Sequence, residues 1–228
     1  MKLQVLGSGY VLPAADEKLE LALLERTLRR GLSELTKLFM HAAKLALDDA
    51  QVAATSAQVV FASAFGEIAV AEALLAEAYE RDASSPARFR NSVHNTAPGL
   101  LSISQRDTAP STAIAAGWDT VAMGLLEASA QLASGIERVL LVFADERIPR
   151  VFGDECTHAA MAVAFVLARE GGRAQLRAPR RCAAPHALDA HPLAGALALA
   201  RAVEQRRAGT LTLSDGASPW CVDVEFPR

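Results

Sequence analysis

Short apolar runs alternate along the chain with segments in which apolar residues recur at helical spacing. Short apolar runs at residues 3–6 and 59–64 predict strands, and the continuous apolar runs at 138–144 and 160–168 predict strands buried on both faces of a sheet. Gly7-Ser8-Gly9 predicts a turn after the first run, and residues 112–116 and 210–213 predict two more strands.

Helical spacing predicts helices at residues 19–30, 33–50, 67–81, 119–134 and 193–205, with a short helix-like stretch within 91–104. Ser33 is placed to cap the second helix, and Gly135 to end the fourth. Strands alternating with helices predict an α/β fold. We expect one domain over residues 1–228, with a mixed, mostly parallel sheet and helices on both faces.

Composition and charge narrow the classes of partner. With a net charge of -3, the protein has no overall positive potential that would attract nucleic acid or an anionic membrane. The apolar stretch at the N-terminus is too short to be the apolar core of a signal peptide, so we expect a cytoplasmic protein. Three cysteines without CxxC spacing argue against a disulfide framework and a zinc site. We expect no metal and no cofactor.

Several segments in the middle of the chain carry a family resemblance. They read VVFASAFGE at 59–67, SPARFRNSVHN at 85–95, PGLLSI at 98–103 and APS at 109–111. In this order they resemble the first half of a β-ketoacyl synthase of the thiolase-like superfamily. The resemblance implies half of a thiolase-like fold.

The spacing within this resemblance locates the family's nucleophilic cysteine. That cysteine lies eight residues after the proline of the family's GPS motif and seventeen before the glycine that ends the next helix. Counting from Pro110 and back from Gly135 gives Trp118 both times. Aligning DTAPST at 107–112 with the family's DTACSS would place Pro110 there instead, but the distance to Gly135 is then eight residues too long. Under either alignment the thiol that carries the acyl chain is absent. No residue of this chain is therefore assigned as catalytic.

The resemblance is strongest over residues 85–145 and weakest over 170–228. Within the superfamily it is greatest to the half-length ketosynthase-like proteins of aryl polyene synthases, which resemble chain length factors. This implies a heterodimer with a full-length ketosynthase, and contact with an acyl carrier protein only indirectly. In the superfamily the strand before the nucleophile pairs across the dimer, which here implicates residues 112–116, with Thr112, Ala113 and Ile114 as the candidates.

Each candidate residue also has a simpler interpretation. Trp118 either plugs a vestigial acyl pocket or only packs in the core. His94 and Asn95 either touch an acyl chain or the partner, or hydrogen-bond a buried turn. His191 faintly resembles a histidine of the family's second half but follows Trp118 too soon, so we give it no role.

Two charged groups are interpreted as ordinary loop and surface. The first consists of Asp154, Glu155, Cys156 and His158, and the second of Arg177, Arg180, Arg181, Arg206 and Arg207.

Two other functions remain open. One is a stand-alone homodimer that serves as a scaffold or binds acyl chains. The other is an acyltransferase with an unusual nucleophile, Cys156 or Ser111.

Overall fold

The computed structural model describes residues 2–14, 18–81, 85–153, 158–182, 191–214 and 218–227. Over these residues the strands form one sheet in the order β3-β2-β4-β5-β1-β6-β9-β7, with β8 paired to β9. The strands are β1 Lys2–Val11, β2 Gln58–Ala62, β3 Ser111–Ile114, β4 Arg138–Asp145, β5 Met161–Ala168, β6 Ala174–Arg177, β7 Arg180–Arg181, β8 Gly209–Thr212 and β9 Trp220–Glu225.

The directions of neighbouring strands correct the expectation of a mostly parallel sheet. In the described part of the chain, β2 is parallel to β3 and β4, and the other six pairings are antiparallel. Parallel neighbours need a long crossover, usually a helix. No α-helix separates β4 from β5 or β8 from β9 among the described residues. Apolar runs report that a strand is buried but not which way it points.

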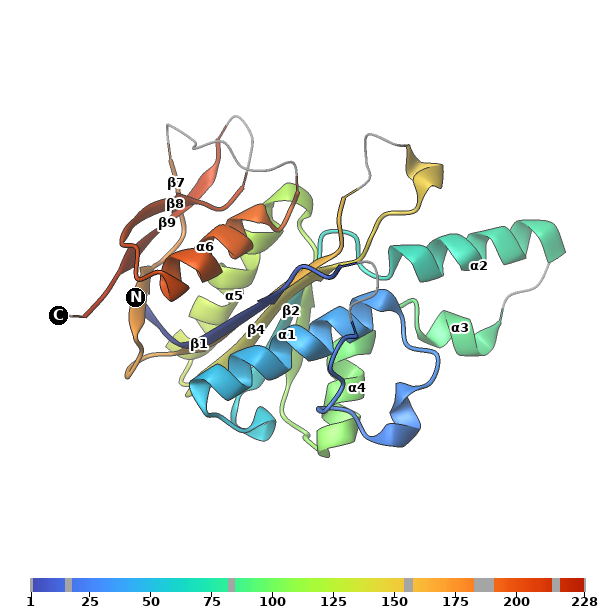
Figure 1. Ribbon diagram of the computed structural model, residues 1–228, viewed down its shortest axis with the longest axis horizontal. Coiled ribbons are helices and arrows are strands. Elements are labelled where there is room, and N and C mark those ends of the chain that lie inside the picture. Colours follow the sequence, from blue (N-terminus) through green and yellow to red (C-terminus); the bar gives the residue numbers. More distant parts are fainter. Residues whose placement is uncertain are drawn as a thin grey trace.

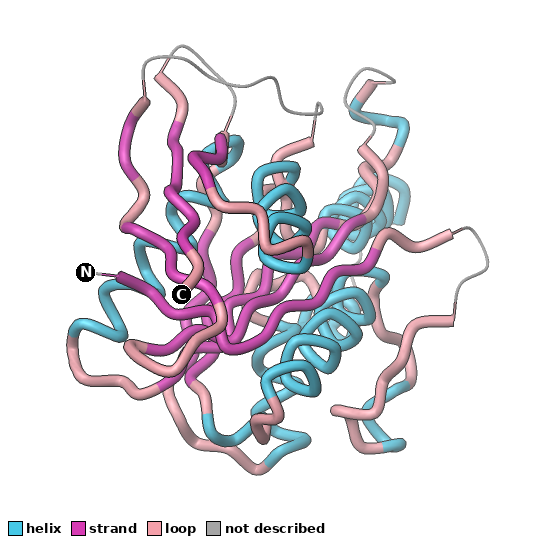
Figure 2. Tube along the Cα trace, turned by 60° about the vertical axis from the view of Figure 1, so that its left-hand side comes forward, coloured by secondary structure: helices cyan, strands magenta, loops and turns pink. Residues whose placement is uncertain are grey.

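Helices cover both faces of the sheet, as predicted. Helices α1 (Glu34–Ala50) and α4 (Thr96–Gln105) share one core with the sheet, whereas α5 (Thr120–Ala133) and α6 (Ala194–Glu204) share the other. Figure 1 shows these pairs on opposite sides of the strands, and Figure 2 shows the same layers from another direction. Helices α2 (Ile68–Arg81) and α3 (Pro86–Arg90) project beyond one end of the sheet (Figure 1).

Two predictions near the N-terminus are wrong. The segment Gly7-Ser8-Gly9 is not a turn, because β1 continues through it to Val11. The leucine-rich residues 19–30 form no α-helix, and only the 3-10 turn η1 (Arg26–Arg29) is helical there. Their apolar side chains, such as Leu24, pack against the face that α1 covers without regular structure.

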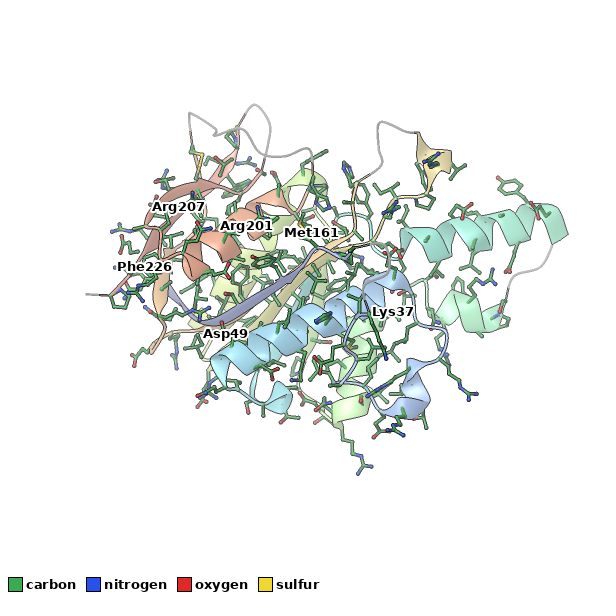
Figure 3. All side chains as sticks on the ribbon, in the orientation of Figure 1. Lys37, Asp49, Met161, Arg201, Arg207 and Phe226 are labelled. Atoms are coloured by element: carbon green, nitrogen blue, oxygen red, sulfur yellow. A yellow bond between two sulfur atoms is a disulfide. The ribbon has the colours of Figure 1, made fainter. Side chains whose placement is uncertain are left out.

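The cysteines correct a further expectation. Cys182, just after β7, and Cys221, in β9, form a disulfide with their Cα atoms 6.0 Å apart (Figure 3). Sequence reasoning missed it because the two residues are 39 positions apart and the strands that align them, β7 and β9, were not predicted. Cys156 lies outside the described residues. No helix of the described part is long and apolar enough to cross a membrane.

Candidate functional site

The connection from β3 to α5 is the turn at which the family resemblance places the nucleophile. It is a short 3-10 turn, η3 (Gly117–Asp119), that leads directly into α5. The Thr120 hydroxyl donates to the Gly117 carbonyl at 2.7 Å and accepts from the Ala116 amide at 3.1 Å. This closed turn presents Trp118 at the helix entrance with 46% of its surface exposed.

Trp118 belongs to an aromatic cluster that we define as Phe65, Trp118, His158 and His191. The His158 ring stacks on Phe65 with centroids 5.8 Å apart, and it meets the Trp118 ring edge-on at 5.9 Å. His191 lies 5.4 Å from His158. The members come from four separate segments: Phe65 follows β2, Trp118 lies within η3, and the two histidines precede β5 and α6. No spacing in the sequence relates these segments, so sequence reasoning missed Phe65 and gave His191 no role.

The hydrogen bonds of His191 define its protonation. Its Nδ1 accepts from the Leu193 amide at 2.9 Å, so its Nε2 carries the hydrogen and donates to the Ala159 carbonyl at 2.9 Å. With both ring nitrogens occupied in this way, His191 is a neutral imidazole that orders the chain before α6.

His94 links the segment before α4 to the end of β3. Its Nε2 donates to the Ile114 carbonyl at 2.9 Å, and its ring lies against Phe61 with centroids 5.3 Å apart. Asn95, by contrast, is exposed, and its side chain makes no capping bond to α4. The two neighbours therefore have different environments.

Strand β3, which contains Thr112, Ala113 and Ile114, forms one edge of the sheet. Within the described residues it pairs only with β2. The Ile114 carbonyl faces β2, because it accepts from the Ser63 amide at 3.0 Å. Since the N–H and C=O of a residue in a strand point to the same side, Ala113 directs its own N–H and C=O to the open edge. The Thr112 hydroxyl accepts from Gln131 of α5 at 3.1 Å.

Three buried carboxyl groups lie behind the turn that carries Phe65. Asp145 accepts from the Ala64 and Phe65 amides, and burial nevertheless raises its pKa to about 7. Burial also raises the pKa of Glu67 to about 7, although Ser33 and Thr36 donate to its Oε1. Burial raises the pKa of Glu146 as well. These groups hold the turn and have no exposed position from which to act on a ligand.

The other charged candidates are placed as follows. Asp154, Glu155 and Cys156 lie outside the described residues, and His158 belongs to the aromatic cluster. In the described ranges no three His, Cys, Asp or Glu side chains gather to hold a metal ion.

Three of the candidate arginines lie in strands β6 and β7 and form ion pairs. Arg177, Arg180 and Arg181 pair with Glu225, Asp223 and Asp119, respectively. Arg206 and Arg207 follow α6, and Figure 3 shows Arg207 near these strands.

Comparisons with known proteins agree on one fold. In a Xenorhabdus doucetiae structure of the ketosynthase ApeO in complex with its chain length factor ApeC, the matching chain has 23% identity and a TM-score of 0.75, over 98% of this chain and 99% of that one. The ishigamide ketosynthase/chain length factor matches with 15% identity and a TM-score of 0.63, over 79% and 68%.

The complex AntDE:AntF, a type II polyketide acyl carrier protein with its ketosynthase, matches with 14% identity and a TM-score of 0.65, over 81% and 69%. At these identities the likeness shows the fold alone. No curated protein matches the sequence. The family model for the β-ketoacyl synthase N-terminal domain matches residues 7–221. The chain belongs to the β-ketoacyl synthase N-terminal domain family.

Proposed function

We propose that this chain is a non-catalytic, chain-length-factor-like subunit that pairs with an active β-ketoacyl synthase in aryl polyene, polyketide or fatty-acid-type biosynthesis. The observation that carries the proposal is Trp118 at the turn entering α5. Condensation needs a nucleophile to carry the acyl chain, and an indole offers none. The sequence has no cysteine between Pro110 and Gly135 that could replace it. The acyl carrier protein then meets this chain only through the partner.

The lengths of the compared chains support this assignment. The match to the ApeO and ApeC complex covers nearly all of both chains, so the matched chain is close to this one in length. We propose accordingly that residues 1–228 form a single domain of the same extent.

The open edge of β3 supports a pairing role. Exposed apolar side chains surround its end, with Phe65, Val93 and Trp118 exposed by 37%, 43% and 46%. An open strand edge offers a partner main-chain hydrogen bonds, and neighbouring apolar side chains add buried area. We place the partner's contact at this edge, with Thr112, Ala113 and Ile114 at its centre and His94 and Asn95 beside it.

The test is coexpression with a full-length ketosynthase encoded by the same organism, followed by affinity pulldown and mass measurement. We expect a 1:1 complex whose condensing activity requires this chain. A stable homodimer that does not bind the ketosynthase would refute pairing and favour the stand-alone scaffold, which would use the same edge. Condensation by the isolated chain would refute the non-catalytic role.

A matched pair of proline variants tests the edge itself. Ala113→Pro removes an N–H that faces the open edge, whereas Thr112→Pro removes one that faces β2. We expect Ala113→Pro to lose the partner with little change in melting temperature, and Thr112→Pro to lower the melting temperature itself. Full partner binding by folded Ala113→Pro would exclude this edge from the interface.

A further inference from the structure

The disulfide joins a buried cysteine to a partly exposed one. Cys221 is 2% exposed, whereas Cys182 is only partly buried. The Cys182 amide donates to the Pro219 carbonyl at 3.0 Å, which continues the pairing of β7 with β9. Thiol–disulfide exchange needs an attacking thiolate to reach one sulfur. Of the two cysteines, Cys182 is therefore the more open to attack by a small thiol.

The residue before Cys182 connects this disulfide to the turn that carries Trp118. Arg181 lies opposite Trp220 in the strand pair, with its guanidinium carbon 4.2 Å from the centroid of the indole. It also donates to the Ser218 carbonyl and, at 3.4 Å, to the carboxylate of Asp119. Asp119 follows Trp118 and precedes the first residue of α5. One arginine therefore spans the disulfide-linked strands and η3.

We propose that Cys182 and Cys221 form a reversible thiol–disulfide site whose oxidation state sets the position of η3, and with it the exposure of Trp118. Its effect on partner binding rests on the function proposed above. Strand β7 has only two residues, so the disulfide is a major constraint on Arg181. Reduction releases that constraint, and Arg181 then holds Asp119 less of the time.

The chemistry needs a small-molecule thiol and its disulfide. The thiolate attacks Sγ of Cys182 and forms a mixed disulfide, while Cys221 leaves as a thiolate and takes a proton. A second thiol attacks the small molecule's sulfur in the mixed disulfide and releases Cys182 as a thiol. In total, two small thiols are oxidised to one small disulfide and the protein disulfide is reduced to two thiols. Oxidation runs through the same steps in reverse.

The first measurement is a thiol count by alkylation under denaturing conditions and intact mass, after equilibration with oxidised or reduced glutathione. The chain has three cysteines. We expect a single alkylated thiol, Cys156, in the oxidised protein and three in the reduced one. Three free thiols in both samples would overturn the proposal.

The second measurement uses the two tryptophans of the chain, which lie at the two ends of this connection. In a Cys156→Ser, Trp220→Phe background, Trp118 is the sole tryptophan and a phenyl ring remains beneath Arg181. We expect acrylamide to quench Trp118 more strongly after reduction. An exposed ion pair shifts an equilibrium by about five-fold at most, so the change is graded.

Two variants separate the disulfide from its connection to η3. Cys182→Ser/Cys221→Ser in the same background should show the quenching of the reduced protein under every condition. Asp119→Asn retains the disulfide but weakens the link to Arg181, so its quenching should respond less to reduction. A redox response of Asp119→Asn equal to that of its parent, or no response in the parent, would refute the connection.

Partner binding is measured last, with the ketosynthase titrated against oxidised and reduced protein. We expect the affinity for the ketosynthase to differ between the oxidised and the reduced protein. In Asp119→Asn we expect the affinities of the two oxidation states to be nearly equal. Equal affinities alongside a redox response of Trp118 would refute the regulatory consequence alone. If the ketosynthase binds neither state while Trp118 still responds, the proposed function fails and the thiol–disulfide site stands.

Discussion

Glu67 is a buried carboxyl group whose surroundings favour its neutral form. Its Oε1 accepts two hydroxyl hydrogen bonds, but its buried Oε2 has no hydrogen-bond partner among the described residues. The nearby carboxylate of Glu146 adds to the burial that raises its pKa to about 7. Because the folded protein retains a proton that the unfolded chain releases near pH 4.5, Glu67 couples folding to pH.

The sign of that coupling gives a prediction. The folded-state pKa lies above the unfolded one, so the contribution is greatest below about pH 4.5, declines as the pH rises towards 7, and stays at its minimum above. We expect Glu67→Gln to be more stable than wild type at pH 8, by about 1–3 kcal/mol, and to lose that advantage near pH 5. Urea unfolding at both pH values measures this. Asp145 and Glu146 still titrate in the variant, so its pH dependence should be smaller rather than absent.

An unchanged difference between variant and wild type at pH 5 and pH 8 would contradict the assignment of a buried, protonated Glu67. Thr55→Ser, a change within the short turn η2 (Ala54–Ser56), provides a variant that should leave the pH dependence as it is.

Among the secondary-structure elements, α1 and β1 approach unusually closely. A Cβ atom built on Gly9 would lie 2.4 Å from the Leu45 Cβ, and one on Gly7 2.4 Å from the Ala50 amide nitrogen. Real Cβ atoms do not come so near, so the lack of a side chain at these two glycines allows α1 to lie directly on β1. These glycines are where sequence reasoning placed a turn, although their role is to let helix and strand make contact.

A pair of alanine substitutions tests this packing. Gly9→Ala should force α1 away from β1 and destabilise the protein by about 1–3 kcal/mol or more. Gly99→Ala, within α4 and with no heavy atom within 4 Å of the new Cβ, should stabilise it by about 0.5–1 kcal/mol. Chemical denaturation of both variants checks the opposite signs. If the two substitutions changed the stability by the same amount and in the same direction, backbone propensity rather than contact between α1 and β1 would determine the effect.

Elements with a strong local signal could be predicted from the sequence, and those fixed by tertiary contact could not. Helix α1 has its cap in the sequence, and the Ser33 hydroxyl accepts from the Thr36 amide as expected. Strands β4 and β5 are continuous apolar runs and are equally clear. Strand β9 is short, with polar and apolar residues mixed, and it is defined by pairing with β6, β7 and β8. Local pattern carries no information about such pairing.

The candidate site divides in the same way. Motif spacing led to Trp118, which lies in the turn η3 before α5. Phe65 and His191 reach the cluster only because the sheet brings the ends of distant strands together. The edge position of β3 likewise depends on strand order, which the sequence pattern does not encode.

For the molecule as a whole, we proposed that this chain is non-catalytic and that its partner carries out the condensation. The substitution Trp118→Cys tests that proposal. This change places a thiol at the entrance of α5, where the amide groups of the helix terminus favour a thiolate. We expect a thiol-directed acyl analogue to label the variant at this position, as shown by peptide mass mapping. We also expect no condensation by the variant alone, since under the proposed function the remaining catalytic residues belong to the partner ketosynthase. Condensation by the isolated variant would show that this chain holds a complete active site.

The open edge of strand β3 also has a consequence for a single copy of the chain that is not bound to the proposed partner. Open edges are the usual starting points of aggregation, because each unpaired strand is a template for the next copy. Here the edge is four residues long and begins directly after Pro110. So short a template offers few main-chain hydrogen bonds to an identical neighbour. The shortness of this edge therefore lets it stay open for the proposed partner with little tendency to seed fibrils of the chain itself.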